Sequence, residues 1–311
     1  MATAQDAAAA SPARATPPLS DAEGARADTP AAAAVMARVG GENFPVASLV
    51  LPRRVRAHLL ALYGFARLVD ELGDEAQGER LAALDWLQEE LDAAYAGGAG
   101  HPLMCTLSVT LRECELPRDP FLRLIEANRV DQRVTRYETW EQLQGYCALS
   151  ANPVGELVLG VFGLASPERI ALSDRICTAL QLVEHCQDVA EDLRRGRIYM
   201  PAQDMRRCGC GEQDLHASHA DEHVRALIAL QTQRVHELLA QGAPLLDTLR
   251  GRSRLAVAAF IAGGRAAALA IERAGFDVLA GVPTASGRAR LRALFTVLSQ
   301  RPAARRHGGT P

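Results

Sequence analysis

Two short acidic segments hold the residues of this sequence that are best suited to chemistry. The first is YGFARLVDELGDE, in which Tyr63, Arg67, Asp70 and Asp74 follow one another at intervals of four, three and four residues. On an α-helix this spacing places the four side chains on one face. Two carboxylates four residues apart repel each other by about 0.3 kcal/mol unless a cation lies between them. Glu71 adds a further negative charge beside this stripe.

The second segment, ALQLVEHCQDVAEDLRRGRIYMP, repeats the pattern. Gln181, Glu184, Asp188 and Asp192 lie at intervals of three, four and four residues, which predicts a polar stripe on an otherwise apolar helix. Three arginines follow directly: Arg194, Arg195 and Arg197.

Two helices that each carry a carboxylate stripe can face each other across a cavity and hold Mg²⁺, which prefers carboxylate oxygens, water and phosphate oxygens. Arg67 and the arginines after the second stripe would then contact a diphosphate directly. Either stripe alone is more typical of a solvated helix face, and only the pair favours a metal–diphosphate site. Tyr63 alone is more typical of a core aromatic residue. His185 is more typical of packing, because no second histidine lies at ligand spacing.

The elements that must position these residues are predicted to be helices. Ala and Leu dominate, β-branched and aromatic residues are sparse, and apolar residues recur at helical spacing. Thr139 and Ser166 are expected helix caps, and Asn152-Pro153 is expected to bend a helix. The chain has neither a glycine-rich phosphate loop after a strand nor an alternation of strands and helices, so one all-α domain is predicted. The expected helices cover residues 54–75, 78–97, 101–116, 118–134, 139–163, 166–196, 219–241, 251–274 and 286–300.

Composition limits the class of protein. The chain has 311 residues, 23% of them charged, and a formal net charge of −3, which argues against general nucleic-acid binding. Residues 1–35, mostly Ala, Pro, Ser, Asp and Thr, are predicted to be disordered because they cannot bury enough apolar surface. Residues 301–311 are predicted to be a flexible basic tail. Residues 36–300 are the predicted catalytic domain.

The sequence also indicates a compartment. Seven cysteines, an odd number, lie mostly within apolar patterns, which favours reduced thiols and a cytoplasmic protein. The most apolar stretch, residues 255–271, contains Arg265 and two glycines and predicts a core helix rather than a membrane span. The N-terminus has no signal-peptide pattern.

The two acidic segments resemble the two aspartate-rich motifs of the squalene/phytoene synthase family, and the resemblance covers about residues 40–300. It implies a single-domain, all-α isoprenoid-synthase bundle with a central cavity. It also implies an enzyme that uses Mg²⁺ to join prenyl diphosphates head to head, or to process the cyclopropyl product, and that releases diphosphate. Residues 42–52 and 135–163 are similar to the HpnC branch of hopanoid gene clusters, whose members convert presqualene diphosphate to hydroxysqualene.

The resemblance implies a role for each matching residue. It makes Asp70 and Asp74 the first Mg²⁺-binding pair and Asp188 and Asp192 the second. It makes Arg67 a diphosphate ligand, as the motif's Arg197 is expected to be. Further residues are expected to line the pocket or to add metal ligands: Tyr63, Ser48, Tyr146, Asn152 and Gln181 for the substrate, and Glu71 and Glu184 for the metal.

The chain also departs from the family pattern. Glu71 stands where the first motif often has a second Asp, Glu184 where many members have Asn, and Gly281 where many have a basic residue. Because no nucleotide-binding motif is present, we expect capture of the cation by water and no use of NADPH.

Two other functions stay open. One is head-to-head condensation of two farnesyl diphosphates to presqualene diphosphate or squalene, and the other is a non-catalytic helical binding protein. Retention of both aspartate motifs argues against the second. Because substrate and product are very apolar, peripheral contact with the inner membrane surface is expected. The sequence carries no signal for the oligomeric state.

Overall fold

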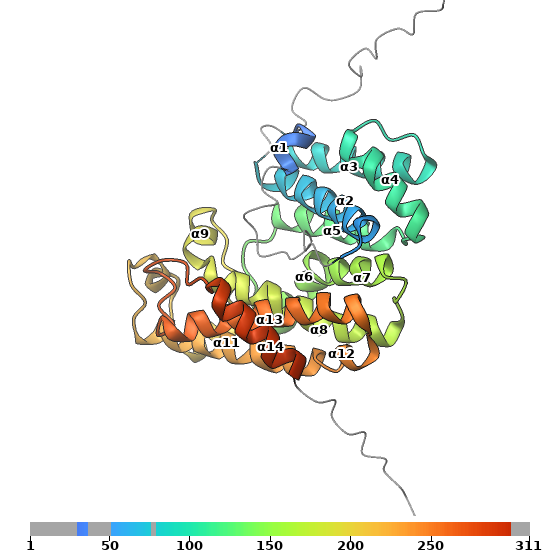
Figure 1. The fold of residues 1–311 in the computed structure, drawn as a ribbon. Helices are drawn as coiled ribbons and strands as arrows, with labels where there is room; N and C mark the ends of the chain where they lie inside the picture. Colours follow the sequence, from blue (N-terminus) through green and yellow to red (C-terminus); the bar gives the residue numbers. More distant parts are fainter. Residues whose placement is uncertain (1–29, 37–50, 76–78, 300–311) are drawn as a thin grey trace, which may run out of the picture.

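The computed structural model describes residues 30–36, 51–75 and 79–299, and Figure 1 shows their arrangement. Within these ranges the β-pairing is limited to one isolated parallel bridge between Arg136 and Ile198. The fold is therefore all-α, as predicted. The helices are α1 Ala32–Met36, α2 Arg53–Asp70, α3 Arg80–Ala96, α4 Pro102–Cys114, α5 Asp119–Asp131, α6 Trp140–Ser150, α7 Asn152–Val161, α8 Pro167–Gln187, α9 Val189–Arg194, α10 Ala202–Arg207, α11 Glu222–Gly242, α12 Leu245–Thr248, α13 Gly251–Arg273 and α14 Gly287–Ser299.

The helices form two packed groups with α6 and α7 between them (Figure 1). Helices α1 to α5 surround one buried apolar cluster that includes Phe65 and Phe121, whose rings meet edge to face. Helices α8 and α11 to α14 surround the other, which includes Leu182 and Ile261. Helix α7 contributes to both clusters, because Leu157 belongs to the first and the nearby Leu159 to the second. Helix α7 therefore connects the two groups.

Local signals explain where several helices begin. The Thr139 hydroxyl accepts from the backbone N–H of Gln142 at 3.3 Å, and the Ser166 hydroxyl caps α8 in the same way. The expected bend is a break at Ala151, so residues 139–163 form α6 and α7 rather than one bent helix. Pro153 lies in the first turn of α7, where its missing N–H leaves no unmade bond.

The expectation of uninterrupted helices over both acidic segments is wrong in two places. Helix α2 ends at Asp70, and a π-helical turn, Glu71–Glu75, continues it. Asp188 leaves the helical conformation, with φ −101° and ψ 12°, and separates α8 from α9. Neither acidic segment therefore presents its carboxylates along one regular helical stripe.

The remaining expectations concern the ends of the chain and the apolar helix α13. Ala32–Met36 form a short helix in which Val35 is buried, although the prediction placed residues up to 35 in a disordered segment. Residues 1–29 and the tail 301–311 lie outside the described residues. Helix α13 has the length and composition of a membrane span, but half of its most apolar window is buried and it packs against α8, α11 and α14. It is a core helix, as predicted. The central cavity stays a prediction.

Candidate active site

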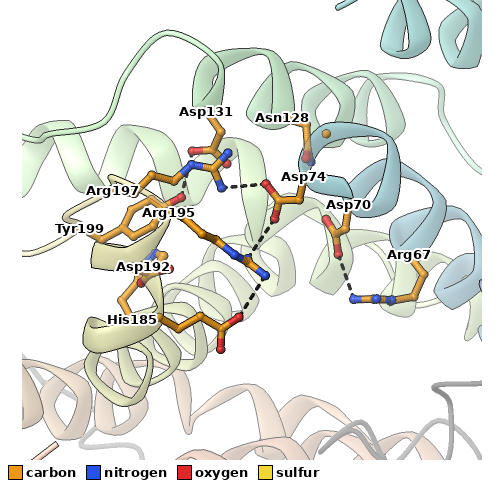
Figure 2. A network of polar contacts seen from close by, with 12 residues as sticks. Arg67, Asp70, Asp74, Asn128, Asp131, His185, Asp192, Arg195, Arg197 and Tyr199 are labelled. Atoms are coloured by element: carbon orange, nitrogen blue, oxygen red, sulfur yellow. Dashed lines mark hydrogen bonds and ion pairs between the residues drawn. The ribbon is translucent and has the colours of Figure 1, made fainter. Parts of the chain in front are cut away.

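The first carboxylate pair lies at the C-terminal end of α2 and in the π-helical turn (Figure 2). Asp70 is half-exposed, and its Oδ2 is 3.9 Å from the Arg67 guanidinium. The same guanidinium is 3.9 Å from Oε1 of Glu71, which is buried. Arg67 thus lies between two carboxylates and partly offsets their repulsion. Arg67, Asp70 and Glu71 therefore lie side by side at the end of α2, and their roles in binding stay predictions.

Asp74 owes its position to close packing of the π-helical turn on α5. The Gly73 carbonyl accepts a hydrogen bond from Gln132 Nε2 at 2.9 Å. A Cβ atom on Gly73 would lie only 2.0 Å from the Asn128 side-chain oxygen, so this approach requires glycine. The turn directs Asp74 toward the segment after α9, where Arg197 donates to Oδ1 at 2.7 Å and Arg195 donates to Oδ2 at 3.3 Å (Figure 2).

The second carboxylate pair lies at the junction of α8 and α9. Asp188 directly follows α8, and Asp192 lies one turn further, in α9. Burial, together with the neighbouring Asp188 carboxylate, raises the pKa of Asp192 to about 7. Burial and Glu191 raise the pKa of Asp188 in the same direction. The charged forms of both carboxylates are therefore disfavoured, mainly by burial, and a bound cation would stabilise them.

The arginine segment after α9 joins the two pairs. Arg195 contacts Glu191 at 3.0 Å as well as Asp74, while Arg197 is buried and its backbone N–H donates to the Asp192 carbonyl at 2.8 Å. Burial lowers the pKa of Arg197, but Tyr199 and Asp74 outweigh it and raise the pKa above its ordinary value, so the group stays charged. Two guanidiniums therefore lie between carboxylates contributed by distant parts of the chain.

The other predicted residues lie around this centre in different ways. Asn152 is buried and its Oδ1 accepts from the Thr178 hydroxyl at 3.0 Å. The Gln181 amide is 3.4 Å from His185 Nε2. Tyr63 is buried in α2, whereas Glu184 is exposed on α8. Ser48 lies outside the described residues, and so does most of the 42–52 segment.

The His185 side chain is buried and packs against other side chains, as its interpretation from the sequence favoured. Its ring stacks on Tyr199 with centroids 3.9 Å apart and planes 14° apart. Burial lowers its pKa to about 3, so the imidazole is neutral. Its Nδ1 is nevertheless 3.9 Å from Asp192 Oδ2, which places this ring beside one member of the second carboxylate pair.

Three residues near the centre were not singled out from sequence. Asp131 accepts hydrogen bonds from Tyr146 and Tyr199, and the rings of Tyr137 and Tyr199 stack with centroids 5.8 Å apart. Tyr199 lies within the second acidic segment, and this position is the one sequence signal that could have identified it. Asp131 carries no local signal, since it is a single acidic residue at the end of an amphipathic helix.

The donor atoms of this centre suit Mg²⁺. In the described ranges no three His, Cys, Asp or Glu side chains converge closely enough to enclose a metal ion. Mg²⁺ rarely needs such an enclosure, because it keeps water ligands and binds through one or two carboxylates plus phosphate oxygens. The all-oxygen donors and the raised pKa values at Asp188 and Asp192 fit an ion that protein and diphosphate share.

Comparison with known proteins decides the family. The family model for squalene/phytoene synthase matches residues 37–294, which is most of the chain and includes both carboxylate pairs. The chain belongs to the squalene/phytoene synthase family. It is therefore a prenyltransferase-type enzyme, and enzymes of this family act on prenyl diphosphates and are generally metal-dependent.

Individual members of the squalene/phytoene synthase family are similar to this chain over most of its length. A hydroxysqualene synthase of Zymomonas mobilis is 35% identical over 64% of this chain and 67% of its own length. A phytoene synthase of Arthrospira platensis is 33% identical over 63% of this chain and 68% of its own length. The crystal structure of squalene synthase HpnC from Alicyclobacillus acidocaldarius is 46% identical, with a TM-score of 0.73 over 78% of this chain and 92% of that one.

Proposed function

We propose that this enzyme converts presqualene diphosphate to hydroxysqualene in hopanoid biosynthesis, with Mg²⁺ and with release of diphosphate. The observation that supports the proposal is that Arg195 and Arg197 pair with Asp74 of the first carboxylate pair and also favour the charged form of Asp192 in the second. Paired carboxylates bind a metal and arginines bind phosphate oxygens, so the centre suits a metal–diphosphate group. The similarity to hydroxysqualene synthase and HpnC supports this branch of the family.

The residues of the site would act mainly on the leaving group. The carbon–oxygen bond to diphosphate breaks, and diphosphate departs with the bonding electrons. Bound Mg²⁺, held by Asp70, Asp74, Asp188 and Asp192, would supply charge stabilisation on the departing oxygens. Arg195 and Arg197, already placed at Asp74, would bind those same oxygens.

The carbon skeleton reacts after diphosphate has left. The remaining cyclopropylcarbinyl cation rearranges, and water adds to it with loss of a proton to give hydroxysqualene. No reductant enters this balance, which is why we expect no use of NADPH.

The alternative within the family is condensation of two farnesyl diphosphates. Similarity to a phytoene synthase at 33% identity favours keeping it as a second candidate. The same diphosphate-binding residues would serve both reactions, because both begin with loss of diphosphate. A non-catalytic relative is disfavoured, because the chain belongs to an enzyme family and keeps both aspartate pairs in its sequence.

A single incubation tests the reaction. Purified protein, presqualene diphosphate and Mg²⁺ without nicotinamide should yield hydroxysqualene in the lipid extract by mass spectrometry. Asp70→Asn should abolish the product. Asp92→Asn is the matched control, because the Asp70 and Asp92 side chains are 53% and 50% exposed and each lies near an arginine; this variant should keep the activity. Product from farnesyl diphosphate alone would establish the alternative, and no turnover of either substrate would overturn both.

We also propose that this enzyme is cytoplasmic and that it contacts the inner membrane surface without spanning the bilayer. Leu291 and Phe295 are exposed on α14, where they lie among Arg288, Arg290 and Arg292. Apolar side chains among arginines suit an anionic lipid surface. The protein should co-sediment with vesicles that contain phosphatidylglycerol, and Phe295→Ser should weaken this binding. Equal binding by the variant would contradict this surface.

A further inference from the structure

Asp131 is a buried acidic residue that the proposed chemistry does not use. It ends α5, and its side chain accepts a hydrogen bond from the Tyr146 hydroxyl at 2.6 Å. It also accepts one from the Tyr199 hydroxyl at 3.0 Å (Figure 2). The two tyrosines come from α6 and from the segment after α9, so one carboxylate joins three separate parts of the chain. Burial raises the pKa of Asp131, while the two hydroxyls and Arg197 oppose that rise.

Tyr199 connects Asp131 to the second carboxylate pair. Its ring stacks on His185 at 3.9 Å, and His185 Nδ1 lies 3.9 Å from Asp192 Oδ2. A rotation of Tyr199 would therefore remove the surface that supports His185 beside Asp192.

Tyr199 also connects Asp131 to the first pair through the backbone. It follows Arg197 by two residues, and Arg197 bonds Asp74 at 2.7 Å. Between them, the Ile198 N–H donates to the Thr135 carbonyl at 2.9 Å, which fixes this segment beside the residues that follow α5. Asp131 thus holds the segment that presents the guanidiniums to the site.

Stability alone is a weak reason for a carboxylate in this place. Burying an acidic group is unfavourable unless its oxygens are hydrogen-bonded, and an apolar residue of similar size often stabilises a core as well or better. Asp204 is a useful comparison, because it is 3% exposed against 9% for Asp131 and also bonds two side chains, Gln231 and Arg234. Its partners lie on α11, and no contact described for it reaches the carboxylate pairs.

We propose that Asp131 is a positioning residue for the diphosphate site, acting through the hydroxyls of Tyr199 and Tyr146 rather than on the substrate. The hydrogen bonds fix both rings and the backbone from Arg195 to Tyr199. The inference rests on the proposed function only where it concerns the reaction, because the hydrogen bonds of Asp131 can be observed in the protein without substrate.

Tyrosine NMR tests the hydrogen bonds directly. The chain has five tyrosines, so labelling with ¹³Cζ-tyrosine gives five signals, which Tyr146→Phe and Tyr199→Phe assign. Asp131→Asn should shift the Tyr146 and Tyr199 signals and leave Tyr63 and Tyr95 in place. Asp204→Asn should shift neither of the first two. Unchanged Tyr146 and Tyr199 signals in Asp131→Asn would overturn the proposal.

Ligand binding tests the positioning role without depending on the reaction. Calorimetry with Mg²⁺ and inorganic diphosphate should show affinity lowered by about 10- to 100-fold in Asp131→Asn, the usual effect of removing a residue that orients ligands. Asp204→Asn should bind like the native protein even if it is less stable. Equal loss in both variants would show a merely structural role and refute the assignment.

Tyr199→Phe covers the case in which Asp131→Asn does not fold. It keeps the stacked ring and removes one hydroxyl, and it should lower diphosphate affinity by less than Asp131→Asn does. Normal affinity in a folded Tyr199→Phe protein would also refute the proposal. If the native protein binds Mg²⁺ and diphosphate but yields no hydroxysqualene, the proposed reaction fails while Asp131 is still tested.

Discussion

Replacing Asp192 with asparagine should stabilise the metal-free protein while destroying its function. A carboxyl whose pKa is raised by folding contributes stability that is fully present below its unfolded pKa and is lost as the pH rises through the folded value. For Asp192 these limits are the ordinary 3.8 and about 7. The native protein therefore bears an increasing penalty between about pH 4 and pH 7, which asparagine does not share.

The size of the effect follows from the same values. A rise from 3.8 to about 7 corresponds to about 4 kcal/mol above pH 7, since each pKa unit is worth about 1.4 kcal/mol. Relaxation of water and of nearby arginines reduces this penalty. We therefore expect Asp192→Asn to raise the free energy of unfolding by about 2 kcal/mol at pH 8. At pH 5 the gain should be about 1 kcal/mol or less, because the native Asp192 is then largely neutral.

Thermal unfolding in EDTA at pH 5 and pH 8 measures this gain. A stabilisation of about 2 kcal/mol should raise the melting temperature at pH 8 by about 4–8 °C. Asp204→Asn is the matched control, and it should destabilise at both pH values because it breaks a buried pair with Arg234. A lower melting temperature for Asp192→Asn at pH 8, or a gain that is larger at pH 5, would refute the reasoning.

Three further outcomes are expected. Asp188→Asn should lower turnover at least 100-fold in the mass-spectrometric assay while Asp92→Asn stays near native, and near-native turnover in Asp188→Asn would contradict its role. Gly73→Ala should destabilise by about 1–3 kcal/mol in urea titrations because its Cβ meets the Asn128 side chain, whereas Gly145→Ala, with open space around it, should be neutral or stabilising. Mg²⁺ with inorganic diphosphate should raise the melting temperature of the native protein, and the absence of any rise would contradict a formed site.

The sequence predicted most of the helical architecture because its signals are local. Apolar spacing located the long helices, and Thr139 and Ser166 marked two helix starts that the structure confirms. The four aspartates were found from spacing and resemblance, and the structure places Asp74 against the arginine segment of the second motif.

The sequence did not predict where the acidic helices change form, because contacts with other helices decide this. The π-helical turn depends on Gly73 lying against Asn128, more than fifty residues away. Asp131 was missed for the same reason, since its partners Tyr146 and Tyr199 lie 15 and 68 residues further along the chain. A spacing rule within one helix cannot report such contacts.

The ion pairs of Asp74 also bear on when the enzyme becomes active during synthesis. Arg195 and Arg197 lie 121 and 123 residues beyond Asp74, and contacts between such distant residues form late in folding. The helices before α6 supply most of one buried cluster and can begin to pack while the rest of the chain is still on the ribosome. Such a nascent chain holds only the first carboxylate pair. The proposed diphosphate site therefore forms only after the second half of the chain has docked on the first.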